Sequence, residues 1–261
     1  MKWTHLCRYQ INARPFLGGV CGDQIIPLMG DFFGSLRENG EPIPLNSVRL
    51  LPPIRPSKVI GIGSNYKQHI AEMGRPTPSV PKIFLKPSTS VIGPNESIMI
   101  PPRTERVDHE AELGVVMGKT AFCVPEEEAM QYVFGYTCVN DVTARDFQKE
   151  DVVFTRGKGF DSFCPIGPWV LPSQEDIPRT VQCYVNGELR QDGSTADLLF
   201  SIPHLISFVS HVMTLHPGDI IATGTPAGVG PLLPGDEVVV DIEGIGSLRN
   251  PVLARFDRDV C

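Results

Sequence analysis

Short apolar runs separated by turn-forming residues recur along the whole chain. Runs of this length, rich in β-branched residues, predict strands. In the larger part of the chain we expect strands at 58–63, 111–117, 136–140, 181–185 and 238–242. The pair Asn186-Gly187 follows the fourth of these runs and is a strong signal for a hairpin turn.

Helical spacing is confined to a few short segments. It predicts helices at 65–73, 125–132 and 201–213, the last with Ser201 as its cap and Pro203 in its first turn. The segment 143–148 is also helix-like, and Thr143 with Asp146 resembles a capping box. Strands dominate without the regular strand–helix alternation of a parallel α/β sheet, so we predict a mixed, mainly β fold with short helices.

A proline cluster divides the chain into two parts. Before it, short apolar stretches are broken by frequent turns, and the cluster itself holds Pro52, Pro53 and Pro56. We predict a small N-terminal β-rich domain over 1–54 and a larger domain over 55–261.

The composition narrows the class of protein. Of 261 residues, 41% are hydrophobic and 20% are charged, which is typical of a folded soluble protein. The net charge of −7 argues against a general nucleic-acid binder. No run approaches the roughly 18 apolar residues of a membrane span, and the first residues have no apolar signal core, so we expect a cytoplasmic protein without membrane contact. Small-molecule chemistry is the better expectation.

Three acidic residues are candidates for a metal site. If the strand expected at 111–117 begins a few residues earlier, Glu110 and Glu112 lie on the same face of it. Two carboxylates this close repel each other unless a cation lies between them. Asp141 follows the apolar run 136–140, where a strand ends. Mg²⁺ suits such oxygen ligands. The alternatives are that the Glu face is merely solvated, which spacing alone favours, and that Asp141 only caps a helix.

His69 and Glu72 lie three residues apart in the predicted helix 65–73, so their side chains can touch. A carboxylate beside an imidazole fixes its tautomer and raises its basicity, as a general base acting on water requires. An ordinary surface pair is the alternative. The proline-rich segment 75–81 follows directly, and a stiff, irregular segment after a short helix is typical of an active-site lid.

Two glycine-containing segments could meet a ligand. Lys158 lies between Gly157 and Gly159, which favours close approach to a substrate carboxylate or enolate, although an ordinary surface turn is commoner. The segment 220–230 is a strand that enters a glycine-rich loop, where backbone N–H groups can bind an anion. Neither this loop nor 61–66, where Tyr66 replaces the third glycine of a dinucleotide fingerprint, predicts a nucleotide site.

Five ordered motifs resemble the fumarylacetoacetate hydrolase family. They are Gly63-x-Asn65-Tyr66-x-x-His69-x-x-Glu72, His109-Glu110-x-Glu112-Leu113-Gly114, Asn140-Asp141-x-Thr143-Ala144-Arg145-Asp146, Gly157-Lys158-Gly159-Phe160-Asp161 and Thr223-Gly224-Thr225-Pro226-x-Gly228-Val229-Gly230. The resemblance covers roughly 55–253. It is closest to the branch of short acylpyruvases, oxaloacetate decarboxylases and 2-hydroxyhepta-2,4-diene-1,7-dioate isomerases.

The resemblance implies a fold, a cofactor and roles for individual residues. The fold would be the family's β-sandwich roll, and the protein a homodimer binding Mg²⁺ or Mn²⁺. The implied metal ligands are Glu110, Glu112 and Asp141. The implied catalytic residues are His69, Glu72 and Lys158, and the implied substrate-binding residues are Tyr66, Arg145, Gln148 and Thr225.

The resemblance and the residues together give one mechanism as an expectation. A 2-oxo acid with a 1,3-dicarbonyl unit chelates the metal, and His69, oriented by Glu72, takes a proton from water. Hydroxide then attacks the distal carbonyl, and carbon–carbon cleavage leaves a pyruvate enolate that the metal and Lys158 stabilise. Decarboxylation of oxaloacetate, or isomerisation of the hydroxy-dienedioate or oxaloacetate, would use the same enolate. A non-catalytic, metal-dependent dicarboxylate-binding dimer is the alternative from another class.

Overall fold

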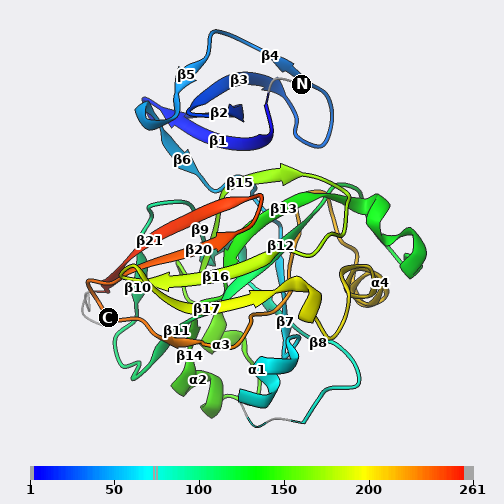
Figure 1. Ribbon diagram of the computed structural model, residues 1–261, viewed down its shortest axis with the longest axis vertical. Coiled ribbons are helices and arrows are strands. Elements are labelled where there is room, and N and C mark those ends of the chain that lie inside the picture. Colours follow the sequence, from blue (N-terminus) through cyan, green and yellow to red (C-terminus); the bar gives the residue numbers. More distant parts are fainter. Residues whose placement is uncertain (1–2, 73, 75, 256–261) are drawn as a thin grey trace, which may run out of the picture.

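The computed structural model describes residues 3–72, 74 and 76–255, and these fold mainly into β-strands (Figure 1). The mixed, mainly β fold predicted from the sequence is therefore confirmed. Within the described residues no helix is both long enough and apolar enough to cross a membrane.

The N-terminal strands form an antiparallel meander at the top of Figure 1. These strands are β1 (His5–Ile11), β2 (Arg14–Cys21), β3 (Gln24–Gly30), β4 (Leu36–Glu38), β5 (Ile43–Pro44) and β6 (Arg49–Leu51). They enclose a small core of their own, formed by Cys7, Tyr9, Val20 and Ile25. The meander is not isolated, because Leu6 of β1 pairs with Val170 of β15 and so joins it to the main sheet.

The main sheet continues from β1 in the order β15-β13-β12-β18-β7-β8. Its strands are β7 (Val59–Gly63), β8 (Lys82–Lys86), β12 (Ala111–Met117), β13 (Val133–Asn140), β15 (Cys164–Pro172) and β18 (Ile220–Ala222), with β9 (Val91–Ile92) paired to β15. All seven residues of β12 are buried. The alternation expected for a half-solvated strand is therefore absent. Strand β12 lies between β13 and β18, and both of its faces are covered, because Leu113 and Val115 pack into one hydrophobic core and Val116 packs into another.

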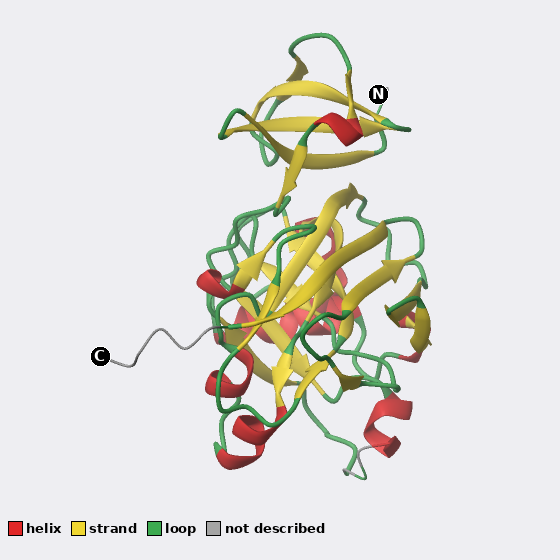
Figure 2. Cartoon of the chain, turned by 90° about the vertical axis from the view of Figure 1, so that its left-hand side faces the viewer, coloured by secondary structure: helices red, strands yellow, loops and turns green. Residues whose placement is uncertain are grey.

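A second sheet packs against the first and closes the roll (Figure 2). Its order is β10-β21-β20-β16-β17, from β10 (Ile98–Ile100), β16 (Thr180–Val185), β17 (Glu188–Ser194), β20 (Glu237–Ile242) and β21 (Gly246–Ala254). The shared core joins side chains such as Leu113 and Val115 of the first sheet to Val181 and Val240 of the second. A small third sheet contains β11 (Val107–His109), β14 (Thr143–Ala144) and β19 (Gly230–Pro231).

Three short helices gather at the end of the roll opposite the N-terminal strands: α1 (Lys67–Glu72), α2 (Arg145–Glu150) and α3 (Thr155–Lys158). The fourth helix, α4 (Ile202–Val212), begins as predicted, with the Ser201 hydroxyl accepting from the backbone N–H of His204 at 3.3 Å. The segment predicted as a helix at 125–132 forms a 3₁₀ helix, Glu126–Tyr132. Met73, the last residue of the helix predicted at 65–73, lies outside the described residues.

The capping box predicted at Thr143 is wrong. Thr143 belongs to strand β14, and its hydroxyl donates to the Asp141 carbonyl at 2.8 Å. Helix α2 begins two residues later without a side-chain cap, and the Asp146 carboxylate accepts from Thr104 and from the backbone N–H of Glu105 instead. Strand pairing between Thr143 and Asp108 thus overrides the local capping signal.

Candidate active site

Two paired strands bring the three predicted acids together. Glu110 lies in the link between β11 and β12, Glu112 lies on β12, and Asp141 directly follows β13. The backbone N–H of Asp141 donates to the Glu110 carbonyl at 2.9 Å. One ligand atom from each acid lies within 4.8 Å of the others, and all three residues are buried. The expectation of a solvated Glu face is therefore wrong.

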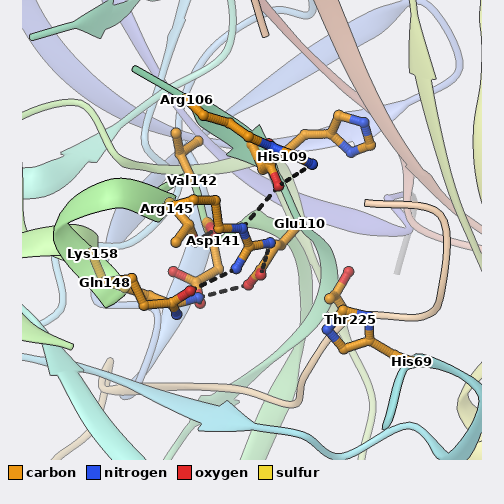
Figure 3. A network of polar contacts seen from close by, with 12 residues as sticks. His69, Arg106, His109, Glu110, Asp141, Val142, Arg145, Gln148, Lys158 and Thr225 are labelled. Atoms are coloured by element: carbon orange, nitrogen blue, oxygen red, sulfur yellow. Dashed lines mark hydrogen bonds and ion pairs between the residues drawn. The ribbon is translucent and has the colours of Figure 1, made fainter. Parts of the chain in front are cut away.

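Two buried cations neutralise part of this acidic cluster (Figure 3). The Lys158 ammonium lies 2.6 Å from Glu110 Oε2 and also pairs with Asp141 Oδ2. The Arg145 guanidinium donates to Glu110 Oε1 at 2.6 Å and to Asp108 Oδ2 at 2.8 Å. Lys158 is 3% exposed, so the surface-turn alternative is wrong. A Cβ at Gly157 would lie only 2.9 Å from the Gln148 nitrogen, so a glycine there lets α3 pack against α2.

The cations act unequally on the three acids. Burial by itself would raise the pKa of Glu110, but Lys158 and Arg145 outweigh it and hold that pKa far below its usual range. Burial, Asp141 and Glu110 together raise the pKa of Glu112 well above its usual value. Lys158 and the backbone N–H of Gly224, which donates to Glu112 at 2.9 Å, lower it but do not outweigh these effects. Despite burial, Asp141 and Glu110 raise the pKa of Lys158, which keeps it an ammonium.

His69 and Glu72 form the predicted pair and face the acids from helix α1. His69 Nδ1 lies 2.9 Å from Glu72 Oε2, and the other carboxylate oxygen accepts from the backbone N–H of Gly228 at 3.0 Å. His69 is 8% exposed, so it is not an ordinary surface residue. A hydrogen on Nδ1 leaves Nε2 as the basic nitrogen of the ring.

One enclosed cavity contains most of these groups. Its lining includes His69, Phe84, Glu110, Glu112, Arg145, Gln148, Phe154, Lys158 and Thr225. In the view of Figure 3, His69 and Thr225 lie on one side of Glu110, and Lys158 and Gln148 lie on the other. The rings of Phe84 and Phe154 meet edge to face at 5.6 Å. A small substrate could therefore meet a base, an ammonium and the carboxylates in one place.

The predicted substrate-binding residues differ in what they offer to the cavity. Gln148 accepts from Arg145 through Oε1 at 3.0 Å, which leaves its amide N–H groups as donors. The Thr225 hydroxyl already donates to the Ala111 carbonyl and accepts from Gln191. Tyr66 is 1% exposed and does not line the cavity, and its hydroxyl has no partner among the described residues.

Two buried side chains that support the site were not predicted. Lys86 donates to Asp141 Oδ1 at 2.5 Å from the end of β8. The Gln191 Oε1 atom accepts from His109 Nδ1 at 2.9 Å, and the Gln191 Nε2 atom donates to the Thr225 hydroxyl at 2.7 Å. Both residues are fully buried. The signal for Lys86 was a lysine at the end of the apolar run 83–85, whereas β17 is mainly polar and gave no such signal for Gln191. Neither residue lies near the acids in sequence.

The donor set fits a hard divalent cation. Three carboxylates supply oxygen atoms only, which suits Mg²⁺ or Mn²⁺ and not a thiophilic metal. Glu112 is buried, and besides Oε2, which Gly224 holds, its Oε1 has no hydrogen-bond donor among the described residues. The residues that would hold the ion are thus Glu110, Glu112 and Asp141.

Known proteins share both the sequence and the fold. The family profile described as "Fumarylacetoacetate (FAA) hydrolase C-terminal" matches residues 58–253, and a profile described as "Rv2993c-like, N-terminal" matches residues 4–53. The chain is 43% identical over 197 residues to "Oxaloacetate tautomerase FAHD1, mitochondrial" of Bos taurus, covering 73% of this chain and 89% of that protein. It is 44% identical over 199 residues to the "4-hydroxyphenylacetate degradation bifunctional isomerase/decarboxylase" of Salmonella dublin, covering 75% and 46%.

A solved structure extends the likeness over nearly the whole chain. The 5-carboxymethyl-2-hydroxymuconate delta-isomerase of Mycobacterium smegmatis superposes with a TM-score of 0.90 at 42% identity, covering 96% of this chain and all of that one. The expected β-sandwich roll of the family is confirmed by this match. The chain belongs to the fumarylacetoacetate hydrolase family and is an enzyme of that family.

Proposed function

We propose that this enzyme uses Mg²⁺ or Mn²⁺ to convert a small 2-oxo acid through an enolate, with cleavage of a carbon–carbon bond as the main outcome. The observation that carries the proposal is that His69, Lys158, Glu110 and Glu112 line one cavity, with Glu72 bonded to His69 and Asp141 beside the other two acids. A base and a stabiliser of negative charge on either side of a small cavity are what enolate chemistry requires.

Each group has a defined task in the proposed reaction. When bound, the divalent cation polarises the substrate's oxygen atoms and offsets their charge. Gln148 donates its amide N–H groups to the substrate, and the Lys158 ammonium stabilises the charge that grows on the 2-oxo oxygen. Phe84 and Phe154 restrict access of bulk water. The electrostatic part of such catalysis is typically worth about 10²–10³ in rate for one well-placed donor.

His69 performs the proton transfer. Glu72 holds Nδ1, so Nε2 can take a proton from water, and the hydroxide adds to the distal carbonyl of a 1,3-dicarbonyl substrate. The carbon–carbon bond then breaks, its electron pair becomes the enolate, and a carboxylic acid and pyruvate are released after protonation. With oxaloacetate, loss of CO₂ gives the same enolate without water.

Isomerisation or tautomerisation is the second candidate. It is favoured by the relatives that are named as isomerases and as an oxaloacetate tautomerase. In this reaction His69 would move a proton between carbon and oxygen of the same substrate, and no bond between carbon atoms would break. The two candidates therefore use the same groups and differ in the product.

A substrate panel tests the proposal. The purified protein with Mg²⁺ is given an acylpyruvate, oxaloacetate or 2-hydroxyhepta-2,4-diene-1,7-dioate, while the enol absorbance and pyruvate are followed. Pyruvate formation supports cleavage, whereas loss of enol absorbance without pyruvate supports isomerisation. No change in any substrate would reject both. Light scattering of the same sample tests the expected homodimer.

His69→Ala tests the base. We expect a loss of about 10²–10⁴ in kcat, the usual contribution of a general acid or base, with Mn²⁺ binding unchanged. The matched control is His204→Ala, because His204 also lies 2.9 Å from a glutamate, Glu126, but on the surface. Unchanged turnover in His69→Ala would reject this residue as the base.

A further inference from the structure

Each of the three acids has one oxygen held by a donor from elsewhere in the chain. Glu110 Oε1 accepts from Arg145 at 2.6 Å, Glu112 Oε2 from the backbone N–H of Gly224 at 2.9 Å, and Asp141 Oδ1 from Lys86 at 2.5 Å. The other oxygen of each acid is Glu110 Oε2, Glu112 Oε1 and Asp141 Oδ2, and a bound cation would take these three, sharing or replacing the contacts that Lys158 makes. Lys158 contacts two of these oxygens, those of Glu110 and Asp141.

Lys86 is the most constrained of the three donors. Its side chain is fully buried and does not line the cavity. The ammonium donates to Asp141 Oδ1, to the Lys158 carbonyl at 2.7 Å and to the Val142 carbonyl at 3.3 Å. An ammonium has three hydrogens, so these acceptors use all of them. Asp141 therefore cannot turn Oδ1 toward the cation without breaking this arrangement.

Three carboxylates that give one oxygen each supply half of a six-coordinate shell. Mg²⁺ requires a near-octahedral shell at about 2.0–2.1 Å and keeps several waters. Ca²⁺ takes six to eight oxygens at about 2.3–2.6 Å and commonly binds a carboxylate through both oxygens. An acid that is prevented from using both oxygens thus disfavours the larger ion.

We propose that Lys86 is a positioning residue that keeps Asp141 a one-oxygen ligand and thereby favours Mg²⁺ over Ca²⁺ at the carboxylate site. This inference rests on the metal site of the proposed function. Among the three donors, Lys86 is the one whose side chain can be exchanged without altering the cavity wall, since Arg145 lines the cavity and Gly224 acts through its backbone.

The selectivity ratio separates this role from a general effect of charge. Removing a buried ammonium makes the site more negative and strengthens the binding of every divalent cation. Mg²⁺ and Ca²⁺ carry the same charge, so this effect largely cancels in the ratio of their dissociation constants. What remains in the ratio is the freedom of Asp141 to offer Oδ1, the oxygen held by Lys86, in addition to Oδ2.

The test measures Kd for Mg²⁺ and for Ca²⁺ by displacement of Mn²⁺, followed by electron paramagnetic resonance. Lys86→Met should lower the ratio Kd(Ca)/Kd(Mg) about tenfold or more, in line with the effect of supporting residues at other metal sites. The matched control is Lys58→Met, because Lys58 pairs with the fully buried carboxylate of Asp219 and is not part of the site. We expect Lys58→Met to lower stability and leave the ratio unchanged.

A second variant guards against loss of folding in Lys86→Met. The side chain of Lys86→Gln is too short to hold Asp141 but retains a polar group for the neighbouring carbonyls, and it should lower the ratio in the same direction. If the wild type binds Mn²⁺ and neither variant changes the ratio relative to Lys58→Met, the role of Lys86 is rejected while the metal site stands. If the wild type binds none of the three cations, both proposals are rejected.

Discussion

Two buried clusters of charged and polar side chains lie beside neighbouring strands, and they are built in opposite ways. One is the candidate active site around β12. The other is Asp219, beside β18, which is fully buried and accepts from the Ser57 hydroxyl at 2.6 Å, from the backbone N–H groups of Lys58 and His216, and from the Lys58 ammonium. Both carboxylate oxygens of Asp219 therefore accept from two donors within the protein.

The candidate site leaves one acid without a charged partner. Asp108, Glu110 and Asp141 each pair with at least one of Arg106, Arg145, Lys158 and Lys86, whereas Glu112 forms no salt bridge among the described residues. Burial would raise the pKa of Asp219, but its hydrogen bonds and Lys58 lower it, whereas the pKa of Glu112 is raised. A carboxylate with complete internal partners stabilises the fold, whereas a buried carboxylate without a charged partner is available to a ligand.

The largest expected effect on stability is at the balanced cluster. Asp219→Asn removes the charge that pairs with Lys58 and should cost about 3–5 kcal/mol of the free energy of unfolding, as for other broken buried pairs. Urea denaturation measures the loss. The control is Glu188→Gln in the exposed pair with Arg190, which should change stability by less than about 1 kcal/mol. If the two variants lowered the free energy of unfolding equally, Asp219 would not be more important for stability than an exposed ion pair.

At the candidate site, removing a carboxylate charge is expected to increase stability rather than lower it. In protein freed of divalent cations, Glu112→Gln should raise the free energy of unfolding at pH 8, because the neutral amide removes the cost of keeping a buried carboxylate charged beside Asp141 and Glu110. The same variant should lose Mn²⁺ binding. A less stable metal-free variant would show that Glu112 is part of a balanced structural cluster after all.

The pH dependence should also separate the two clusters. A raised pKa in the folded state means that Glu112 favours folding below its ordinary pKa and loses this contribution as the pH rises through the raised value. The stability advantage of Glu112→Gln should therefore grow from about pH 5 to pH 8. The lowered pKa of Asp219 has the opposite consequence, so the deficit of Asp219→Asn should shrink only as the pH falls below about 4. Urea titrations across pH measure both trends, and parallel curves would contradict them.

The sequence predicted the elements whose signals are local. The apolar run 111–117 is strand β12 with those bounds, and the three-residue spacing of His69 and Glu72 places them in contact on α1. The order of motifs was enough to identify the family. A run of β-branched residues favours a strand, and a three-residue spacing on a helix brings two side chains together, whatever the rest of the chain does.

Tertiary contacts decided the rest. Thr143 has a good local capping signal, yet pairing with Asp108 draws it into a strand. Lys86 is separated from Asp141 by 55 residues, and nothing in its neighbourhood of β8 marks it as a partner of an acid. The burial of Glu110 and Glu112 likewise depends on strands β13 and β18 and on α3, which their own spacing does not encode.

The two oxygens of Glu72 join helix α1 to a loop 156 residues further along the chain, one holding His69 and the other the backbone of Gly228. A displacement of α1 from that loop breaks the hydrogen bond between Glu72 and Gly228 and at the same time moves the His69 ring from its place in the cavity wall. In the proposed reaction, His69 would be aligned as the base only while α1 lies against that loop. Proton transfer would then be coupled to enclosure of the substrate, and the carbanion would be protected from proton exchange with solvent until the reaction is complete.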